Sequence, residues 1–295
     1  MNKYWYIASY PKSGNTWCRI FVSELIRISR KDNLVNDSYG NISFENWNEI
    51  NRGCILSSYK LIEDHLGIDI SEFSFDELEK LRSKIKELKI PYLNSYPYVK
   101  IHDSFYGKNK DISIIPTKNC GGVVYIVRHP ADVALSLSKF KKISLEESIK
   151  FLINSDAALC DSKSRGYSQA YQYLGTWGDH VKNWNSQNKI PILTIRYEDM
   201  IQSPNTQFLN IASFLKISTN EKFIKKAIKL ADFSRLKNME KKFGFPEASS
   251  EKITFFRKGI TGEGVSKLKS IQLNLLEKKF KTTLLALGYK LKTIN

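Results

Sequence analysis

Residues 10–17, which read YPKSGNTW, bring together side chains that could bind an anion. Gly14 permits a backbone conformation that a side chain would block. Ser13 and Thr16 offer hydroxyl groups near an expected helix start, where free backbone N–H groups and the helix dipole favour negative charge. Lys12 adds a positive charge to the same turn. The natural ligand of such a turn is a phosphate or a sulfate group.

An ordinary connection between a strand and a helix, with a solvated lysine, is the alternative for this turn, because short motifs recur by accident. The turn also differs from the phosphate loop of P-loop kinases and ATPases, which reads Gly-x-x-x-x-Gly-Lys-Ser/Thr. Here Lys12 precedes Gly14, and no lysine followed by a hydroxyl residue stands at the helix start to hold Mg²⁺. The turn therefore indicates a cradle for an anion that needs no metal.

A second group of candidate residues follows the apolar run 123–127, which is typical of a strand buried on both faces. Arg128 stands where this strand should end, and Pro130 suits the first position of a helix. Arginine can bind a phosphate with two parallel hydrogen bonds, and Ser136 could add a hydroxyl group from the helix. The alternative is an arginine that forms a salt bridge at a strand end.

A third group lies in residues 255–262, which read FFRKGITG and place two cations and two glycines beside two aromatic residues. Arg257, Lys258 and Gly259 are the candidates for anion binding, and a basic surface loop is the alternative. The fourth group is Lys100 and His102, at the end of an expected strand, where parallel α/β sheets hold their ligands. A lone histidine more often has a structural role, but histidine is also the natural general base near neutral pH.

In this order along the chain, the four groups resemble the motifs of the cytosolic-type sulfotransferases, which use 3′-phosphoadenosine 5′-phosphosulfate (PAPS) as sulfuryl donor. The resemblance runs over residues 10–262, nearly the whole chain. It implies that Arg128, Ser136 and the segment Arg257, Lys258 and Gly259 bind the 3′-phosphate of PAPS. It also implies that the 5′ end of PAPS lies over the first turn, on Lys12, Ser13, Gly14, Asn15, Thr16 and Trp17.

The resemblance implies roles in catalysis as well. His102 corresponds to the general base that takes a proton from the acceptor, and the three other histidines match no catalytic position. Lys12 and Lys100 correspond to lysines that stabilise negative charge on the leaving group. The reaction implied is the transfer of a sulfuryl group from PAPS to a hydroxyl or an amine of a small molecule.

Weaker matches concern the adenine of the donor. Trp17 and Tyr197 stand where the family places aromatic residues beside the adenine. The family also contacts the donor through a Thr-Ser-Phe segment, of which this chain keeps only the phenylalanine, Phe233. After the Arg-Lys-Gly segment the family usually continues with Asp-Trp-Lys, whereas this chain has residues 263–265, which read EGV. This departure concerns the packing of the segment more than its phosphate contact.

Strands and helices are expected to alternate along the chain, which favours an α/β fold of three layers, with a mostly parallel central sheet flanked by helices. The resemblance makes this a P-loop-NTPase-like sulfotransferase fold, and we expect one domain over residues 1–295. Strands are predicted over 4–8, 97–102, 123–127 and 190–195. Helices are predicted over 18–28, 75–88, 131–140, 145–159, 169–187, 221–230 and 268–287.

Composition leaves one further alternative. The 295 residues include 46 Lys and Arg against 30 Asp and Glu, a formal net charge of +16. Such a surface attracts anionic molecules, so a polyanion-binding protein without catalysis is an alternative to the enzyme. The basic residues lack the aromatic interleaving of an RNA-binding sheet, so no nucleic-acid partner is predicted. Lysine-rich runs such as 222–229 and 278–281 are expected to be solvated helix faces.

The four cysteines lie far apart, without metal-ligand or Cys-x-x-Cys spacing, so no metal site is predicted. The sequence contains no signal-peptide pattern and no apolar run long enough to span a bilayer. We therefore expect a cytoplasmic protein with reduced thiols and no membrane insertion.

The sequence says less about the acceptor molecule than about the donor. Residues 32–67, 104–121 and 156–172 match the family least and are expected to form the wall of the acceptor pocket. A small hydroxylated metabolite of a specialised pathway is the expected acceptor. The oligomeric state is open, because the family's C-terminal dimerisation pattern is not clear over 267–277. A P-loop kinase-like phosphotransferase is the alternative enzyme class.

Overall fold

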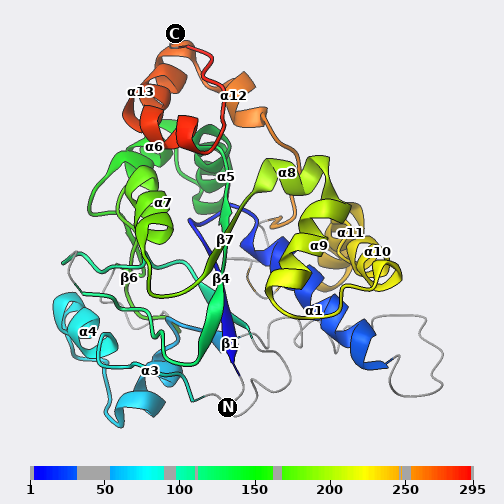
Figure 1. Ribbon diagram of the computed structural model, residues 1–295. Coiled ribbons are helices and arrows are strands. Elements are labelled where there is room, and N and C mark those ends of the chain that lie inside the picture. The colour runs from blue at the N-terminus through cyan, green and yellow to red at the C-terminus, as the bar shows by residue number, and fades with distance from the viewer. Residues whose placement is uncertain are drawn as a thin grey trace.

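A central sheet lies between two groups of helices in the computed structural model (Figure 1). The statements below concern the residues that the structure describes, which are 3–31, 54–89, 98–109, 112–161, 168–245, 247 and 254–293.

The sheet has five parallel strands in the order β2–β3–β1–β4–β7. Its first strand in sequence, β1, lies in the middle, between β3 and β4. The mostly parallel sheet predicted from the sequence is confirmed. The strands are β1 (Tyr4–Ser9), β2 (Cys54–Ile55), β3 (Tyr98–Ile101), β4 (Cys120–Val127) and β7 (Ile192–Arg196).

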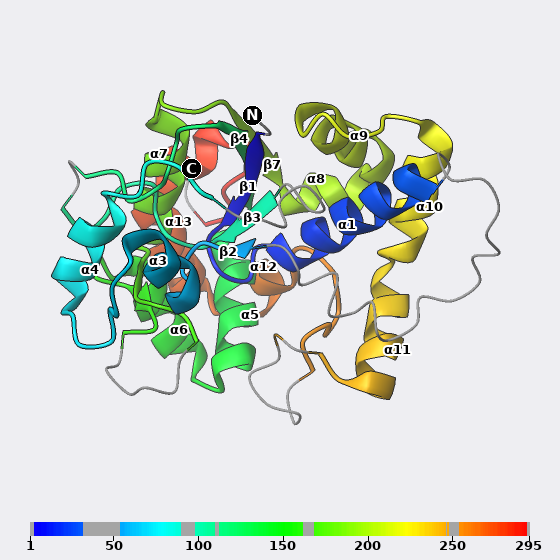
Figure 2. The same cartoon turned by 90° about the horizontal axis from the view of Figure 1, so that it is seen from below.

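Both faces of the sheet are buried. In β1, Tyr4, Tyr6 and Ala8 enter one hydrophobic core, while Trp5 and Ile7 enter the other, as the period of two in a strand requires. Helices pack on each face and give the three layers that the sequence predicts (Figures 1 and 2). The first core includes residues of α5 (Pro130–Lys141), α6 (Leu145–Ile153), α7 (Trp177–Ser186) and α13 (Ser270–Ala286); the second includes residues of α1 (Asn15–Lys31), α9 (Pro204–Phe214) and α10 (Glu221–Leu230).

The remaining elements are five helices and a pair of strands among the described residues. The chain also forms α3 (Tyr59–Leu66), α4 (Phe75–Arg82), α8 (Tyr197–Gln202), α11 (Phe233–Phe243) and α12 (Glu263–Lys267). A separate antiparallel pair consists of β5 (Ala158–Leu159) and β6 (Gln172–Tyr173). Among the described helices none is long and apolar enough to cross a membrane.

Three predicted helices prove too long. The helix predicted over 75–88 ends at Arg82, and the one over 145–159 ends at Ile153, before the chain enters β5. The helix predicted over 169–187 begins only at Trp177, because the left-handed Gly175 (φ 66°) stops any earlier turn. Thr176 then caps α7 by accepting a hydrogen bond of 3.0 Å from the Asp179 N–H. Apolar side chains before it belong to the β5–β6 pair and its flanks.

Three of the four predicted groups of site residues emerge at one edge of the sheet, together with Tyr197. The anion-binding turn follows β1, His102 follows β3, Arg128 follows β4, and Tyr197 follows β7. Since these strands are parallel neighbours, their carboxyl ends lie side by side. The topology therefore assembles one site from distant parts of the chain.

The short helix α12 is fastened to the start of α5. The buried Asp132 carboxylate accepts hydrogen bonds from the backbone N–H groups of Gly262 (2.7 Å) and Gly264 (2.5 Å). A Cβ on Gly264 would lie 2.2 Å from backbone atoms of Ala131, so only glycine fits this approach. Residue 264 stands where the family usually has tryptophan, and its small size explains how the segment packs here.

We expect Gly264→Ala to lower the free energy of unfolding by about 1–3 kcal/mol, because the added methyl group meets backbone that cannot step aside. Urea unfolding followed by circular dichroism measures the change. Ser266→Ala, at an exposed position of the same helix, is the control and should stay within about 1 kcal/mol of the parent protein. Equal stability of Gly264→Ala and its parent would show that α12 is free to move away from α5.

Candidate active site

The turn after β1 has the conformation that an anion cradle needs. Gly14 has a φ of 103°, and a Cβ there would lie 2.5 Å from the ring of Tyr197. Glycine is therefore required both by the backbone and by the aromatic ring beside it. Lys12 also has a positive φ of 68°, which is uncommon for a residue with a side chain. Helix α1 begins immediately afterwards, at Asn15.

Lys12 lies in an aromatic and partly buried environment. Its ammonium group is 3.9 Å from the centre of the Phe140 ring and 4.2 Å from that of Phe255. Burial lowers the pKa of Lys12 to about 7, with a contribution from nearby Lys100, although Glu247 opposes the shift. A cation held among rings in this way gains from an added anion, because water no longer solvates it fully. Phe140 was not predicted as part of the site, and Phe255 was noted only as an aromatic neighbour of the basic segment.

The other side chains of the turn differ in their partners. Ser13 is fully buried, and its hydroxyl oxygen has no hydrogen-bond partner among the residues that the structure describes. Asn15 donates to the Ile7 carbonyl (2.9 Å) and accepts from Arg19 Nε (2.9 Å), so its side chain joins β1 to α1. The contribution of Asn15 to anion binding is thus left to its backbone N–H group. An unpartnered buried hydroxyl is costly, which makes Ser13 an available donor to a ligand.

Arg128 joins three segments of the site. Its guanidinium group donates to the carbonyls of Lys12 (3.2 Å) and Ile260 (2.9 Å), and it lies 4.5 Å from the centre of the Tyr197 ring. Its Nε is buried and has no hydrogen-bond partner in the described part of the chain, and the Asp132 carboxylate lies 3.9 Å away from it. Arg128 therefore keeps a donor that its protein contacts do not use, and a simple strand-end salt bridge does not describe it.

The basic segment before α12 shares one carboxylate. Arg257 and Lys258 form ion pairs with Glu263 at 2.7 and 2.6 Å. Gly259 has a φ of 63°, and a Cβ there would lie 2.5 Å from the ring of Phe233. The segment therefore packs against Phe233, which is predicted to lie beside the adenine. Its two cations are paired with Glu263 of α12.

His102 has a defined tautomer. Its Nδ1 lies 2.9 Å from the Ser9 carbonyl oxygen, and because a carbonyl only accepts, Nδ1 carries the proton. Nε2 is then an unprotonated acceptor, and no hydrogen bond to it is found within the described ranges. Burial lowers the pKa of His102 to about 3, and Lys100 acts in the same direction. The imidazole is therefore neutral near pH 7, which is the state that a general base requires.

His180, which matches no catalytic position of the family, fixes the backbone of His102. Its Nε2 lies 2.9 Å from the His102 carbonyl oxygen, and its Nδ1 lies 2.8 Å from the Tyr125 hydroxyl. The carbonyl identifies Nε2 as the protonated nitrogen, so Nδ1 accepts from the tyrosine. His180 and Tyr125 are fully buried, and their hydrogen bonds hold the end of β3 in place.

Lys100 is buried beside a carboxylate that the sequence did not indicate. Its ammonium group lies 3.2 Å from Glu247 Oε2, and the same oxygen accepts a 3.1 Å hydrogen bond from Thr16 Oγ1. Arg19 forms an ion pair with the other oxygen of Glu247. Glu247 and Arg19 are therefore site residues that sequence analysis missed; neither belongs to a recognisable motif.

The adenine-side residues form an aromatic wall. The Trp17 indole N–H donates to the Ala231 carbonyl (2.8 Å), and its ring meets Tyr197 and Phe208 edge-on. Phe233 begins α11 and packs edge-on against Phe256. The structure brings these rings together with Arg128, as the predicted site requires.

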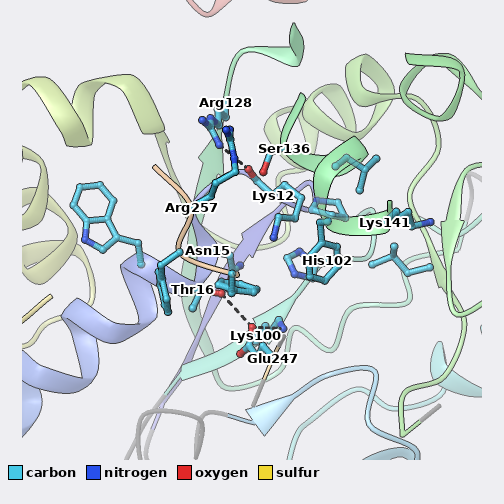
Figure 3. A pocket seen from close by; sticks show the side chains of 18 of the residues that line it. Lys12, Asn15, Thr16, Lys100, His102, Arg128, Ser136, Lys141, Glu247 and Arg257 are labelled. Atoms are coloured by element: carbon cyan, nitrogen blue, oxygen red, sulfur yellow. Dashed lines mark hydrogen bonds and ion pairs between the residues drawn. The ribbon is translucent and has the colours of Figure 1, made fainter. Parts of the chain in front are cut away.

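One cavity of about 750 Å³ connects all these groups (Figure 3). Of the predicted site residues, Ser13 is the exception, since it lies beneath the cavity surface rather than in its lining. The figure shows Lys12, His102 and Lys100 around the same space, with Arg128 and Ser136 at its upper end. The predicted residues that line the cavity are Lys12, Gly14, Asn15, Thr16, Trp17, Lys100, His102, Arg128, Ser136, Tyr197, Phe233, Arg257, Lys258 and Gly259.

The remaining lining is partly polar. Two of the three segments predicted to wall the acceptor pocket contribute to it, although 32–53 and 162–167 lie outside the described residues. The third segment, 104–121, contributes no described residue to the lining of this cavity; near Pro116 the chain runs to the opposite end of β1, where the Tyr4 and Tyr6 hydroxyls donate to the Pro116 carbonyl. The lining from the two segments is Ile55, Leu159, Cys160, Asp161, Ser168, Gln169 and Gln172.

The described residues show no group of three or more His, Cys, Asp or Glu side chains that could hold a metal ion. Cys18, Cys120 and Cys160 are free thiols.

Comparison with known proteins identifies the same family over almost the whole chain. The model of the sulfotransferase domain family matches residues 4–288. Sulfotransferase 1B1 of mouse is 28% identical over 262 residues, covering 87% of this chain and 74% of the relative. Human sulfotransferase 1E1 is 26% identical over 269 residues, with 87% and 75% covered.

Solved structures share the fold. Mouse sulfotransferase SULT7A1 in complex with 3′-phosphoadenosine 5′-phosphate (PAP) has a TM-score of 0.58 at 18% identity, covering 96% of this chain and 84% of that one. Retinol dehydratase in complex with retinol and PAP has a TM-score of 0.57 at 19% identity, covering 96% and 82%. The sheet, the cavity at its carboxyl edge and the family match agree: the chain belongs to the sulfotransferase family.

Proposed function

We propose that this protein is a PAPS-dependent sulfotransferase acting on a hydroxyl or amine group of a small molecule. The observation that carries the proposal is that a neutral His102, with an unprotonated Nε2, lines the same cavity as the partly buried cation Lys12. One group can take a proton and the other can stabilise developing negative charge, which are the two needs of group transfer to a hydroxyl. PAP complexes among the structural relatives support the choice of donor.

The residues present fit PAPS, which supplies an activated sulfuryl group when bound. Ser13 Oγ and Arg128 Nε are buried donors that find no partner within the described ranges, and each belongs to a predicted anion contact. We assign Ser13 and the N–H groups at the start of α1 to the 5′ end of the donor, and Arg128 to its 3′-phosphate. Arg257 and Lys258 complete the second contact, and Ser136 faces the same part of the cavity (Figure 3).

The surroundings of His102 and Lys12 suit the two roles that sulfuryl transfer requires. His102 Nε2 accepts the proton of the acceptor, while Nδ1–H stays bound to the Ser9 carbonyl and keeps the ring oriented. Lys12, in its protonated form, and Lys100 stabilise the charge that develops on the leaving group. The low exposure of Lys100 strengthens this effect, because charges interact more strongly away from water.

The acceptor is proposed from the cavity wall. Gln169, Gln172 and Asp161 offer hydrogen-bonding groups, while Ile55 and Leu159 are apolar. This mixture suits a small molecule that carries several polar groups rather than a purely apolar ring system. We propose a cytoplasmic enzyme with reduced thiols, without nucleic-acid partners.

The family membership argues against the two alternatives considered from the sequence, a P-loop kinase-like phosphotransferase and a non-catalytic polyanion-binding protein. The exposed lysines of α10 and α13 are solvated helix faces, as predicted, so much of the net charge lies outside the cavity.

PAP should raise the melting temperature of the protein, because a ligand that binds only the native state stabilises it. Adenosine 5′-phosphate, which lacks the 3′-phosphate, and ATP should have much smaller effects at equal concentration. Thermal shift with the three nucleotides is the measurement. Equal shifts would remove the case for a 3′-phosphate contact at Arg128 and Arg257.

His102→Ala should lower turnover by about a hundredfold to ten-thousandfold, the usual loss of a general base. Its affinity for PAP should be unchanged, because the assigned donor contacts lie elsewhere. Radiolabelled PAPS with a panel of hydroxylated and amine acceptors measures turnover, and calorimetry measures PAP binding. His65→Ala, outside the cavity lining, is the control. Normal turnover of a folded His102→Ala variant would assign the proton transfer to another group.

The pH dependence of PAP binding should report Lys12. Its pKa in the free protein is lowered to about 7, so the protonated form, which favours an anion, is lost as pH rises from about 7 to 9. We expect the dissociation constant of PAP to rise over this range, approaching tenfold per pH unit. Lys12→Arg stays charged and should bind PAP with a flat profile. A pH dependence that persists in Lys12→Arg would belong to another group.

A further inference from the structure

Glu247 places a carboxylate in the part of the cavity where the first turn, α1 and β3 meet (Figure 3). One of its oxygens accepts from Thr16 Oγ1 at 3.1 Å and lies 3.2 Å from Lys100 Nζ. The other oxygen pairs with the Arg19 guanidinium group. Its side chain is 16% exposed. Glu247 thus fills a position with three donors from two separate elements.

Arg19 is the least expected member of this group. It lies one turn into α1, and its long side chain runs back toward the start of the helix, as helical geometry favours. Its Nη2 lies 3.1 Å from Thr16 Oγ1, and its side chain is 1% exposed. The cation therefore adds to the positive end of the helix dipole at the place where an anion is expected.

The charges of the cluster do not balance. Among the described residues, two buried cations, Arg19 and Lys100, face one carboxylate, that of Glu247. Burial of a cation without an anion is costly, so a carboxylate compensates them while no ligand is present. Burial alone would raise the pKa of Glu247, but Arg19 and Lys100 lower it strongly, so the group is ionised at neutral pH.

Two of these donors have another assigned use. Thr16 is predicted to contact the donor's 5′ end, and Lys100 is proposed to stabilise charge on the leaving group; both are bound to the same oxygen of Glu247. A sulfate or phosphate group beside that carboxylate would meet like-charge repulsion at close range. The carboxylate and the donor anion therefore exclude each other.

We propose that Thr16, Arg19 and Lys100 form the subsite for the anionic 5′ end of the donor, and that Glu247 is an internal competitor that occupies it. This inference rests on the proposed PAPS donor. Arg19 becomes a donor-binding residue outside the sequence motif, and Glu247 sets the donor affinity. The donor must displace the Glu247 carboxylate, so the observed affinity is lower than the subsite itself would give.

The test combines a variant with a trimmed ligand. Glu247→Gln keeps the shape of the side chain and removes its charge. We expect it to bind PAP about tenfold more tightly, because no anion has to be displaced. Adenosine 3′-phosphate lacks the 5′ group, so its affinity should be the same in the variant and the parent. Calorimetry at one ionic strength measures the four dissociation constants.

Glu221→Gln is the matched control, since it removes one charge from an exposed pair with Lys225 on α10 and should change neither ligand's affinity. Unchanged or weaker PAP binding by Glu247→Gln would overturn the proposal and assign Glu247 a structural role. An equal gain in affinity for PAP and for adenosine 3′-phosphate would overturn it too. The gain would then come from the lower negative charge of the protein as a whole, not from a freed 5′ subsite. If the parent protein binds neither nucleotide, the proposed function itself fails.

Arg19 has a separate test. Arg19→Gln should weaken PAP binding by about tenfold or more and leave adenosine 3′-phosphate unaffected, because a charged hydrogen bond is lost only with the 5′ group. Arg19→Lys keeps the charge and replaces the glutamine variant in this test if that variant does not fold. It should retain part of the preference for PAP over adenosine 3′-phosphate. Full PAP affinity in a folded Arg19→Gln protein would remove Arg19 from the subsite.

Discussion

Parallel pairing of β1 with β3 and β4, and of β4 with β7, is the constraint on which the site depends. In this register Ala8 lies opposite Ile101, Ser9 opposite Ile126, and Val127 opposite Arg196, so the four strands end at nearly the same level. Each of these strands is followed by predicted site residues, which are therefore delivered to the same edge. The segment 255–262 comes from another part of the chain and joins the site where the Ile260 carbonyl accepts a hydrogen bond from Arg128. An antiparallel partner would carry its motif to the far edge of the sheet. The apolar strands that pack against both helical layers thus also bring charged residues from distant parts of the chain together.

Positive charge at this edge is held in three different ways. Lys12 lies against two phenyl rings, Lys100 and Arg19 share a carboxylate, and Arg128 donates to two backbone carbonyls. The cations remain close without complete neutralisation, which makes the cavity attractive to an anion with two separated charged ends. This local arrangement, rather than the overall net charge, is what distinguishes the cavity from the lysine-rich helix faces.

Sequence reasoning succeeded where the signal is local. The strand, turn and helix around Gly14 follow from hydrophobic pattern and turn chemistry, and so do the strand before Arg128 and the helix that Pro130 opens. The gathering of the motifs followed from the expected parallel sheet. Most of the predicted residues line the cavity for that reason.

The failures are physical in origin. The helix expected over 169–187 was overruled by the pairing of β5 with β6, a tertiary contact that local propensity does not contain. Glu247 could not be found because its partners Lys100 and Arg19 are 147 and 228 positions away. The same holds for Lys12 and its rings, and for His180 beneath His102: side-chain neighbours across such separations are set by packing, not by spacing.

The contacts of Arg128 show how late such a site must form. Its two carbonyl partners, at Lys12 and Ile260, are 116 and 132 positions away in opposite directions along the chain. The guanidinium group is thus a junction that closes only after both loops have been brought back to the sheet, and loop closure over such lengths is slow. A chain emerging from the ribosome has its first turn and its Arg128 well before Ile260 is made. Under the proposed function, nucleotide binding at this junction would consequently distinguish the finished fold from any shorter intermediate, and the ligand would report complete folding.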